Sequence, residues 1–320
     1  MTRPISHHAA FVLNAVQSPS DAGVSAVAAS WCRSAQHHGL DPEAATDRTR
    51  VDSSFLNARL EEHQALLSIA NPVLEQIFRA VGRSGCCVVL SDPHGVILQR
   101  HVNDGDAEQF TQVGLVEGGQ WAEANEGTNG IGTCLVEGRP LIIHRDQHFA
   151  SRNIGISCMD APVFDPHGKL IAALDVSSYR DDHGPAMADI IAALVRDAAA
   201  RIEREYFCHH FDGHQIIFLP DNGPSATALL ATDRDGLIIG ASRAARLRLG
   251  LSLQDQLLSK PMSVDQLLGT GDTPSFEDGD RAVVRQALAQ AGGNASKAAR
   301  ILGIGRATLY RRMKRAGLKP

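Results

Sequence analysis

Short apolar runs separated by turn sequences recur through the middle of the chain. Two of the turns, Asp92–Gly95 and Asp165–Gly168, share the sequence Asp-Pro-His-Gly, and each lies between runs that are typical of strands. A run, a tight turn and a second run favour an antiparallel hairpin, so the pattern predicts an α+β domain with a sheet of five or six antiparallel strands. The predicted strands are Cys86–Leu90, Val96–Arg100, Leu141–His144, Ile156–Phe164 and Leu170–Ser178, and the flanking helices are Asn71–Val81 and Pro185–Tyr206.

The last forty residues follow a helical period instead. Gly292 and Gly293 end a first helix, because glycine adopts the left-handed conformation at a helix end without steric cost. Asn294 is placed to cap a second helix by accepting a hydrogen bond from a free amide group, and Gly303 ends that helix. The predicted helices are Asp280–Ala291, with an apolar stripe of Val283, Val284, Ala287 and Leu288, then Ala295–Leu302 and Arg306–Ala316.

Charge is divided unevenly between this segment and the rest of the chain. Residues 281–320 contain ten of the 31 Lys and Arg residues and no Asp or Glu, which leaves 21 basic against 36 acidic residues in the first 280. A compact basic segment on an acidic chain indicates contact with a polyanion. Two helices, a glycine turn and a basic helix form the plan of a helix-turn-helix, whose last helix enters the DNA major groove. The alternative to a DNA-binding segment is an ordinary pair of helices whose basic face is exposed to solvent.

The third predicted helix has two faces. Leu309 and Met313 face the first two helices, and the basic side chains point outward. Arg306 and Arg311 are the candidate base readers because a guanidinium group binds guanine bidentately, whereas the lysines and the remaining arginines suit phosphates. The candidate DNA-binding residues are Lys297, Arg306, Thr308, Tyr310, Arg311, Arg312, Lys314 and Arg315.

The sequence GGNASKAARILGIGRATLYRRMKRAGL resembles the Fis-type helix-turn-helix of bacterial nucleoid proteins and enhancer-binding activators. The resemblance covers about forty residues and implies binding to double-stranded DNA. One departure is Gly305, which stands where the nucleoid protein Fis has Asn at the start of the recognition helix. Base readout is therefore expected from Arg306, Thr308, Tyr310 and Arg311, or from DNA shape.

The middle of the chain resembles a GAF sensor domain, more narrowly that of the regulators of acetoin and glycerol metabolism. The resemblance is carried by Ser30–Pro42, Gly118–Phe149 and Ser157–Ser177. It implies a small-molecule site between the sheet and the helix-bearing loop Gln120–Glu137. Aromatic walls with a few orienting polar groups suit such a site. The alternative is that Trp121 and Phe149 belong to the core and that Asn125 and Asn129 cap turns. The candidate ligand-binding residues are Trp121, Asn125, Thr128, Asn129, Thr133, His144, His148 and Phe149.

Two more specific functions of this region, a metal site and a reactive cysteine site, are not favoured. His144 and His148 are four residues apart, as in a zincin helix, but no Glu occupies the HExxH position and His144 ends a predicted strand. Cys134 and Cys158 could form a redox switch, or the site of an enzyme that reduces free methionine sulfoxide, if Arg139 and Arg145 made their surroundings electropositive. The sequence predicts no bound metal, no cofactor and no enzymatic activity.

Length and composition favour several domains of an ordinary globular protein. No signal-peptide pattern and no apolar run near the ~20 residues that span a bilayer is found, and the six cysteines lack CxxC spacing. These features predict a cytoplasmic location. The predicted divisions are a helical segment at 1–64, a GAF-like sensor at 65–208, a truncated PAS-like segment at 209–268, a linker at 269–279 and the helix-turn-helix at 280–320.

The sequence lacks the P-loop of the ATPase domain that enhancer-binding activators carry between sensor and Fis-type module. The only Gly-Lys pair, Gly168-Lys169, has Val163 where a P-loop requires Gly. The chain is therefore expected to be a homodimeric, effector-responsive transcription regulator that acts without ATP hydrolysis, and RNA polymerase or another regulator is the partner that recruitment implies. The alternatives are the methionine sulfoxide reductase and a sensor that acts through protein contacts alone.

Overall fold

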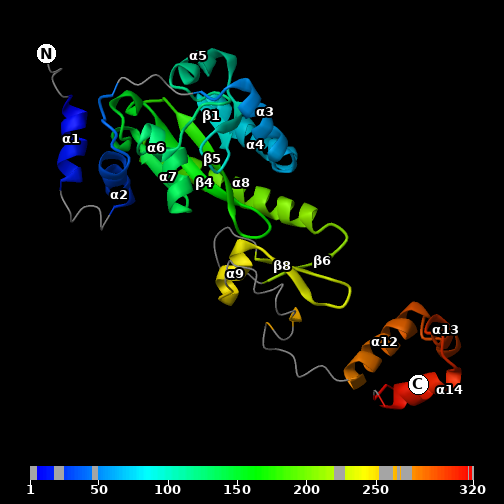
Figure 1. The fold of residues 1–320 in the computed structure, drawn as a ribbon. Coiled ribbons are helices and arrows are strands. Elements are labelled where there is room, and N and C mark those ends of the chain that lie inside the picture. The colour runs from blue at the N-terminus through cyan, green and yellow to red at the C-terminus, as the bar shows by residue number, and fades with distance from the viewer. Residues whose placement is uncertain are drawn as a thin grey trace. The chain divides into compact units, whose positions relative to one another are not determined.

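The computed structural model describes residues 6–17, 25–44, 50–219, 228–251, 262–264, 267, 276–315 and 317–318. Its main feature is the predicted antiparallel sheet, with five strands in the order β2-β1-β5-β4-β3 (Figure 1). Predicted and observed strands differ by at most one residue at each end. The strands are β1 Cys86–Ser91, β2 Ile97–His101, β3 Leu141–His144, β4 Ser157–Phe164 and β5 Leu170–Ser178.

Helices cover both faces of this sheet. On one face α4 (Gln64–Val81) and the long α8 (Pro185–His210) bury their apolar stripes against alternate residues of β1, β4 and β5. On the other face the remaining strand residues pack against Phe110, Trp121 and Ile131. That second layer contains α5 (Asp104–Gln112), α6 (Glu123–Glu126) and α7 (Gly130–Glu137). Short 3₁₀ turns follow α4 at Gly82–Ser84 and β3 at Arg145–Gln147 and Ser151–Asn153.

Helix α4 begins earlier than the sequence predicted. The prediction began at Asn71 because proline favours the first turn of a helix, but the observed helix begins at Gln64 and contains Pro72 in its interior. Interior proline removes one helical hydrogen bond and costs about 3 kcal/mol. Leu66 and Ala70, which precede the proline, are buried in the same core as Val73. This continuous apolar face offsets the local cost.

The amino-terminal helices pack on the sensor sheet and its loops. They are α1 (His7–Val16), α2 (Ala26–Cys32) with a π-helical continuation at Arg33–His37, and α3 (Ser53–Glu62). Val12 and Trp31 form a small core with Phe149, and the Trp31 indole N–H donates to the Gln147 carbonyl at 2.8 Å. On α3, Arg59 forms a 2.7 Å ion pair with the fully buried Asp92.

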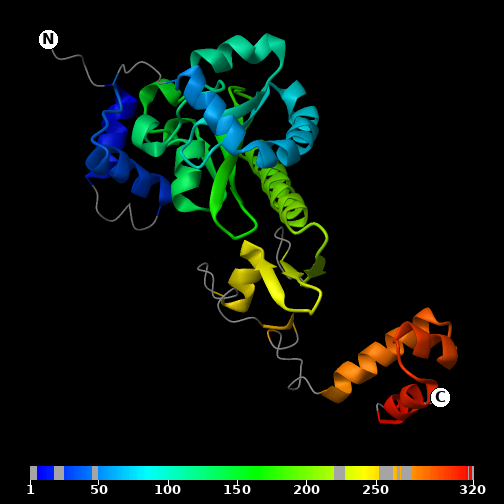
Figure 2. The same cartoon turned by 45° about the vertical axis from the view of Figure 1, so that its right-hand side comes forward.

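A small three-stranded antiparallel sheet follows α8 directly (Figure 2). It consists of β6 (Gln215–Phe218), β7 (Leu229–Thr232) and β8 (Ile238–Ala241), and α9 (Arg243–Leu249) follows it. Phe207 and Phe211 at the end of α8 pack against Leu229 and Ala231, which joins this sheet to the sensor. Within the predicted PAS-like segment 209–268, β6, β7, a tight turn at Asp233–Gly236, β8 and α9 therefore follow one another.

Residues 261–320 form a second compact unit, separate from residues 1–260, and its described part contains three named helices. The helices are α12 (Phe276–Gln290), α13 (Ala295–Ile301) and α14 (Arg306–Arg315). Helix α12 starts four residues before the predicted Asp280, so the end of the predicted linker is helical, and the linker's first residues, 269–275, lie outside the described residues. Val283 is half exposed, which corrects its place in the predicted stripe, whereas Val284 and Ala287 are buried. No helix in the described ranges is long and apolar enough to cross a membrane.

Candidate nucleic-acid interface and sensor interior

The turn between α13 and α14 presents the basic helix as predicted. The Asn294 side chain caps α13 by accepting hydrogen bonds from the amides of Ser296 and Lys297 at 3.0 and 3.1 Å. Gly293 and Gly303 have φ angles of 81° and 64°, a region that glycine adopts without strain. Leu309 and Met313 are buried with Val284 and Ala298 in the core of the unit.

On the outer face of α14, each candidate base-reading arginine forms a hydrogen bond with another candidate residue of the same helix. The Arg306 guanidinium lies 5.5 Å from the centre of the Tyr310 ring and donates to its hydroxyl at 3.3 Å. Arg311 donates to the Thr308 hydroxyl at 3.4 Å. Both arginines are exposed, so their guanidinium groups are oriented by neighbours one turn away and are still accessible to a base edge.

The candidate phosphate contacts divide into free and paired side chains. Lys297, Lys314 and Arg315 are exposed. Arg312 forms an ion pair with Asp280 on α12, a contact the sequence analysis did not predict. In this arrangement Arg312 ties the recognition helix to the first helix, and it would have to leave Asp280 to reach a phosphate.

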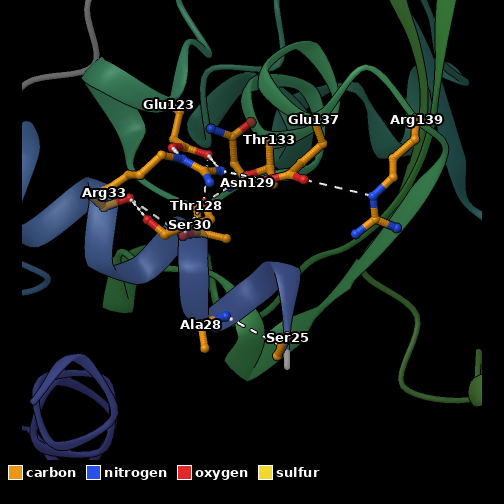
Figure 3. A network of polar contacts seen from close by, with 11 residues as sticks. Ser25, Ala28, Ser30, Arg33, Glu123, Thr128, Asn129, Thr133, Glu137 and Arg139 are labelled. Carbon is orange, nitrogen blue, oxygen red and sulfur yellow. Dashed lines mark hydrogen bonds and ion pairs between the residues drawn. The ribbon is translucent and has the colours of Figure 1, made fainter. Parts of the chain in front are cut away.

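Three of the predicted ligand-binding residues lie in a buried polar network between α2 and the α6–α7 segment (Figure 3). Ser30 on α2 donates to Glu123 at 2.6 Å, so its hydroxyl accepts the contacts from Thr128 at 2.7 Å and from Thr133 at 3.2 Å. Asn129 caps α7 by accepting from the Gly132 amide at 2.8 Å. The contact of these residues with α2 was not predicted, because no local sequence pattern marks α2 as a neighbour of α6 and α7.

The same network contains a partly buried ion cluster. Arg33, at the end of α2, forms a 2.7 Å ion pair with Glu123 and a 2.9 Å pair with Glu137 (Figure 3). Hydrogen bonding to Glu123 is the largest cause of a raised pKa for Arg33. Glu123 is almost fully buried, so loss of Arg33 would leave a buried carboxylate without its counter-ion.

The other predicted ligand-binding residues have separate environments. Trp121 is buried in the sensor core and its indole N–H donates to Gly114, whereas Asn125 is exposed and donates to Gln120. Half-buried His144 contacts the Ser157 hydroxyl at 2.8 Å. His148 is fully buried against the Arg145 carbonyl and Cys158, and burial lowers its pKa to about 4. Phe149 packs under α1 and α2.

A buried carboxyl pair on this face of the sheet was not predicted. Asp160 on β4 and Asp175 on β5 are register partners with 1% and 0% exposure. Neither Asp160 oxygen has a hydrogen-bond donor among the described residues, and Asp175 receives one from Ser177 at 2.8 Å. Burial raises both pKa values, that of Asp175 to about 7, and the like charge raises that of Asp160 further. The sequence contained one sign of this pair, since each Asp is the only charged residue of its predicted strand.

The surroundings of Cys134 and Cys158 are unlike those of reactive thiols. Both are buried, and burial with the nearby Asp160 and Asp175 raises their pKa values well above the ordinary range. Reactive cysteines need an accessible, electropositive setting that favours the thiolate. Of the two arginines that could have made this setting electropositive, Arg145 forms a 2.7 Å ion pair with Asp181, and Arg139 lies 3.8 Å from Glu137.

Comparison with known proteins assigns families to the two parts of the chain. Residues 65–204 match the GAF domain, and residues 275–315 match the bacterial regulatory protein family of Fis type. A region of 230 residues, 69% of this chain and 34% of the relative, is 32% identical to the acetoin catabolism regulatory protein of Cupriavidus necator. The AcoR activator of the Bacillus subtilis acetoin dehydrogenase operon is 26% identical over 55% of this chain and 29% of its own length. The chain thus spans about a third of the length of these relatives.

One solved structure shares the fold of the first part. It is the Escherichia coli DhaR(N)-DhaL complex, in which the matched chain has a TM-score of 0.52 and 17% identity over 83% of this chain and 86% of its own length. At that identity the likeness concerns the fold alone. The chain therefore carries a GAF domain and a Fis-type helix-turn-helix and is related to the regulators of acetoin operons, which confirms the resemblance found in the sequence.

Proposed function

We propose that the chain is a signal-responsive, sequence-specific DNA-binding transcription regulator. The observation that carries this proposal is the Fis-type unit itself: capped α13, a glycine turn and the outward basic face of α14 in one chain with a GAF domain. Only residues 205–274 lie between the two matched families, so we infer regulation without an intervening ATPase domain. The buried, high-pKa thiols give the methionine sulfoxide reductase alternative no support.

The effector site is proposed on the α7 side of the sensor sheet. The buried residues there, Thr128, Asn129, Thr133 and His148, carry hydrogen-bonding groups beside the apolar cluster of Trp121 and Ile131. An effector would exchange their present contacts with Ser30, Gly132 and the Arg145 carbonyl for its own. An effector shifts DNA affinity only by its differential free energy for two arrangements of the chain, typically ~1–3 kcal/mol. We infer that it acts by changing how the helix-turn-helix units are held, because none of these residues belongs to the DNA-binding unit.

Base readers and phosphate contacts should differ in the effect of their removal. Arg306→Ala or Arg311→Ala is expected to cost about 1–3 kcal/mol on the cognate site and to relax preference at one base pair. Lys314→Ala should weaken binding to all sequences alike and reduce the slope of log affinity against log salt by about 0.9. The measurement is footprinting of the full chain on genomic fragments, followed by titrations of the selected site and a scrambled site at several salt concentrations.

Two results would contradict this assignment. Absence of any sequence-selected footprint would refute the proposed function. If Arg306→Ala and Arg311→Ala left the preference intact while Lys314→Ala removed it, α14 would meet DNA through another face.

A homodimer is proposed because one Fis-type unit covers little DNA, whereas two recognition helices can read half-sites one helical turn apart. Helix α8 offers the pairing surface: Met187, Ile190 and Leu194 recur at i, i+3 and i+7 and are 41%, 58% and 40% exposed. Ile190→Glu is expected to shift the protein toward the monomer in light scattering and to weaken operator binding. The exposed Asp189→Lys, one residue outside the stripe, is the control. A wild-type chain that is monomeric at micromolar concentration and still binds its operator one-to-one would rule out the dimer.

A further inference from the structure

A cavity of about 290 Å³ lies where α8, the end of β4 and α9 meet, apart from the proposed effector site. Its polar lining is Arg139 before β3, Arg196 and Glu203 on α8, and Arg243 at the start of α9. Phe164, Leu247 and several alanine and proline residues form the apolar remainder. Since a water molecule occupies ~30 Å³ in the liquid, the space equals roughly ten waters and suits a small metabolite.

The three guanidinium groups are poorly neutralised. Within the described part of the chain, neither Arg196 nor Arg243 forms an ion pair, and Arg139 has only a long 3.8 Å contact with the partly exposed Glu137 (Figure 3). Arg243 is held in place by stacking, with its guanidinium carbon 3.9 Å from the centre of the Phe164 ring. The cavity therefore gathers positive charge beside an aromatic wall.

The single carboxyl group of the cavity supplies little compensating charge. Glu203 accepts a hydrogen bond from the Phe164 amide at 3.1 Å. Burial raises its pKa to about 7, against the opposite effects of that hydrogen bond and of Arg243. Near neutral pH Glu203 is thus partly protonated, and the lining keeps a net positive charge that an anion would balance.

We propose that this cavity binds a small organic oxyanion, a carboxylate or a phosphate, through Arg139, Arg196 and Arg243, with its carbon chain against Phe164. Guanidinium groups bind both kinds of oxyanion through charge-assisted, often bidentate hydrogen bonds. Arg243 belongs to the three-stranded subdomain, whereas Arg139 and Arg196 belong to the sensor. A bound anion therefore bridges the sensor to the segment that leads toward the DNA-binding unit and favours the arrangement in which they touch.

The test is calorimetric titration of the full chain with butanedioate, butanoate and inorganic phosphate, and with neutral butanamide as the uncharged counterpart. At least one of the anions is expected to bind saturably, and butanamide is not. Arg243→Gln and the more exposed Arg196→Gln should each weaken the anion's affinity about 10- to 100-fold. Arg248→Gln, on α9 but outside the cavity, is the matched control and should leave the affinity unchanged.

The pH dependence gives a second readout. For the two carboxylates, which are already ionised in this range, the affinity should fall as the pH rises through about 7, because Glu203 then becomes a carboxylate facing the anion. Glu203→Gln, which keeps an acceptor for the Phe164 amide, should remove that dependence. Failure of all three anions to bind saturably, or equal binding by wild type, Arg243→Gln and Arg196→Gln, would overturn the proposal. None of these readouts involves DNA, so the proposed regulator function stands or falls separately.

Discussion

Leu309→Ala is expected to unfold the helix-turn-helix unit and abolish DNA binding while the sensor domain stays folded. Leu309 is fully buried among Val284, Ala298 and Met313, and its truncation leaves a cavity in a core of mostly small side chains. Such substitutions cost about 2–5 kcal/mol, and a three-helix unit of this size has little stability to lose. Calorimetric unfolding of the full chain should lose the transition of this unit and keep that of the sensor.

Ile301→Ala is the matched control for this prediction. It removes a similar volume from the same unit, but Ile301 is 46% exposed, so we expect only a small loss of stability and an unchanged footprint. Comparable losses of unfolding free energy in Leu309→Ala and Ile301→Ala would show that Leu309 of α14 is not at the centre of the core of this unit.

Asp175→Asn is expected to stabilise the sensor domain above neutral pH. The pKa of Asp175 rises from 3.8 to about 7 on folding, chiefly through burial, so the folded state binds more protons than the unfolded state in that range. Stability therefore falls as the pH rises from about 4 to 7, and the full penalty, on the order of 4 kcal/mol, applies above 7. The neutral amide avoids this penalty, accepts from Ser177 and donates to Asp160.

The measurement is urea unfolding of wild type and variant from about pH 4 to about pH 9. The two proteins should be similar at the acid end and diverge as the pH rises. The exposed Asp189→Asn serves as control and should follow wild type throughout. Parallel curves for Asp175→Asn and wild type across this range would mean that the carboxyl pair does not carry the described penalty.

Local chemistry in the sequence determined the strands of the sensor sheet and the helices of the DNA-binding unit. The two Asp-Pro-His-Gly turns place the ends of their strands, and β3 and β5 have the predicted bounds. Asn294 and the glycines of the helix-turn-helix act on the backbone within a few residues, so their roles and the burial of Leu309 could be read from spacing alone. Family resemblance then supplied what spacing does not encode, the identity of the two domains.

Contacts between distant segments were decided only by the tertiary structure. Burial of both halves of α4 overrides the local preference of Pro72 for a helix start, and Arg312 finds Asp280 thirty-two residues away. The same holds for Ser30 above Thr128 and for Asp160 beside Asp175, where strand order brings two carboxyl groups together. Packing and electrostatic interactions depend on distance in space and not on separation in sequence, so the sequence pattern predicts which elements form and the fold decides which charges meet.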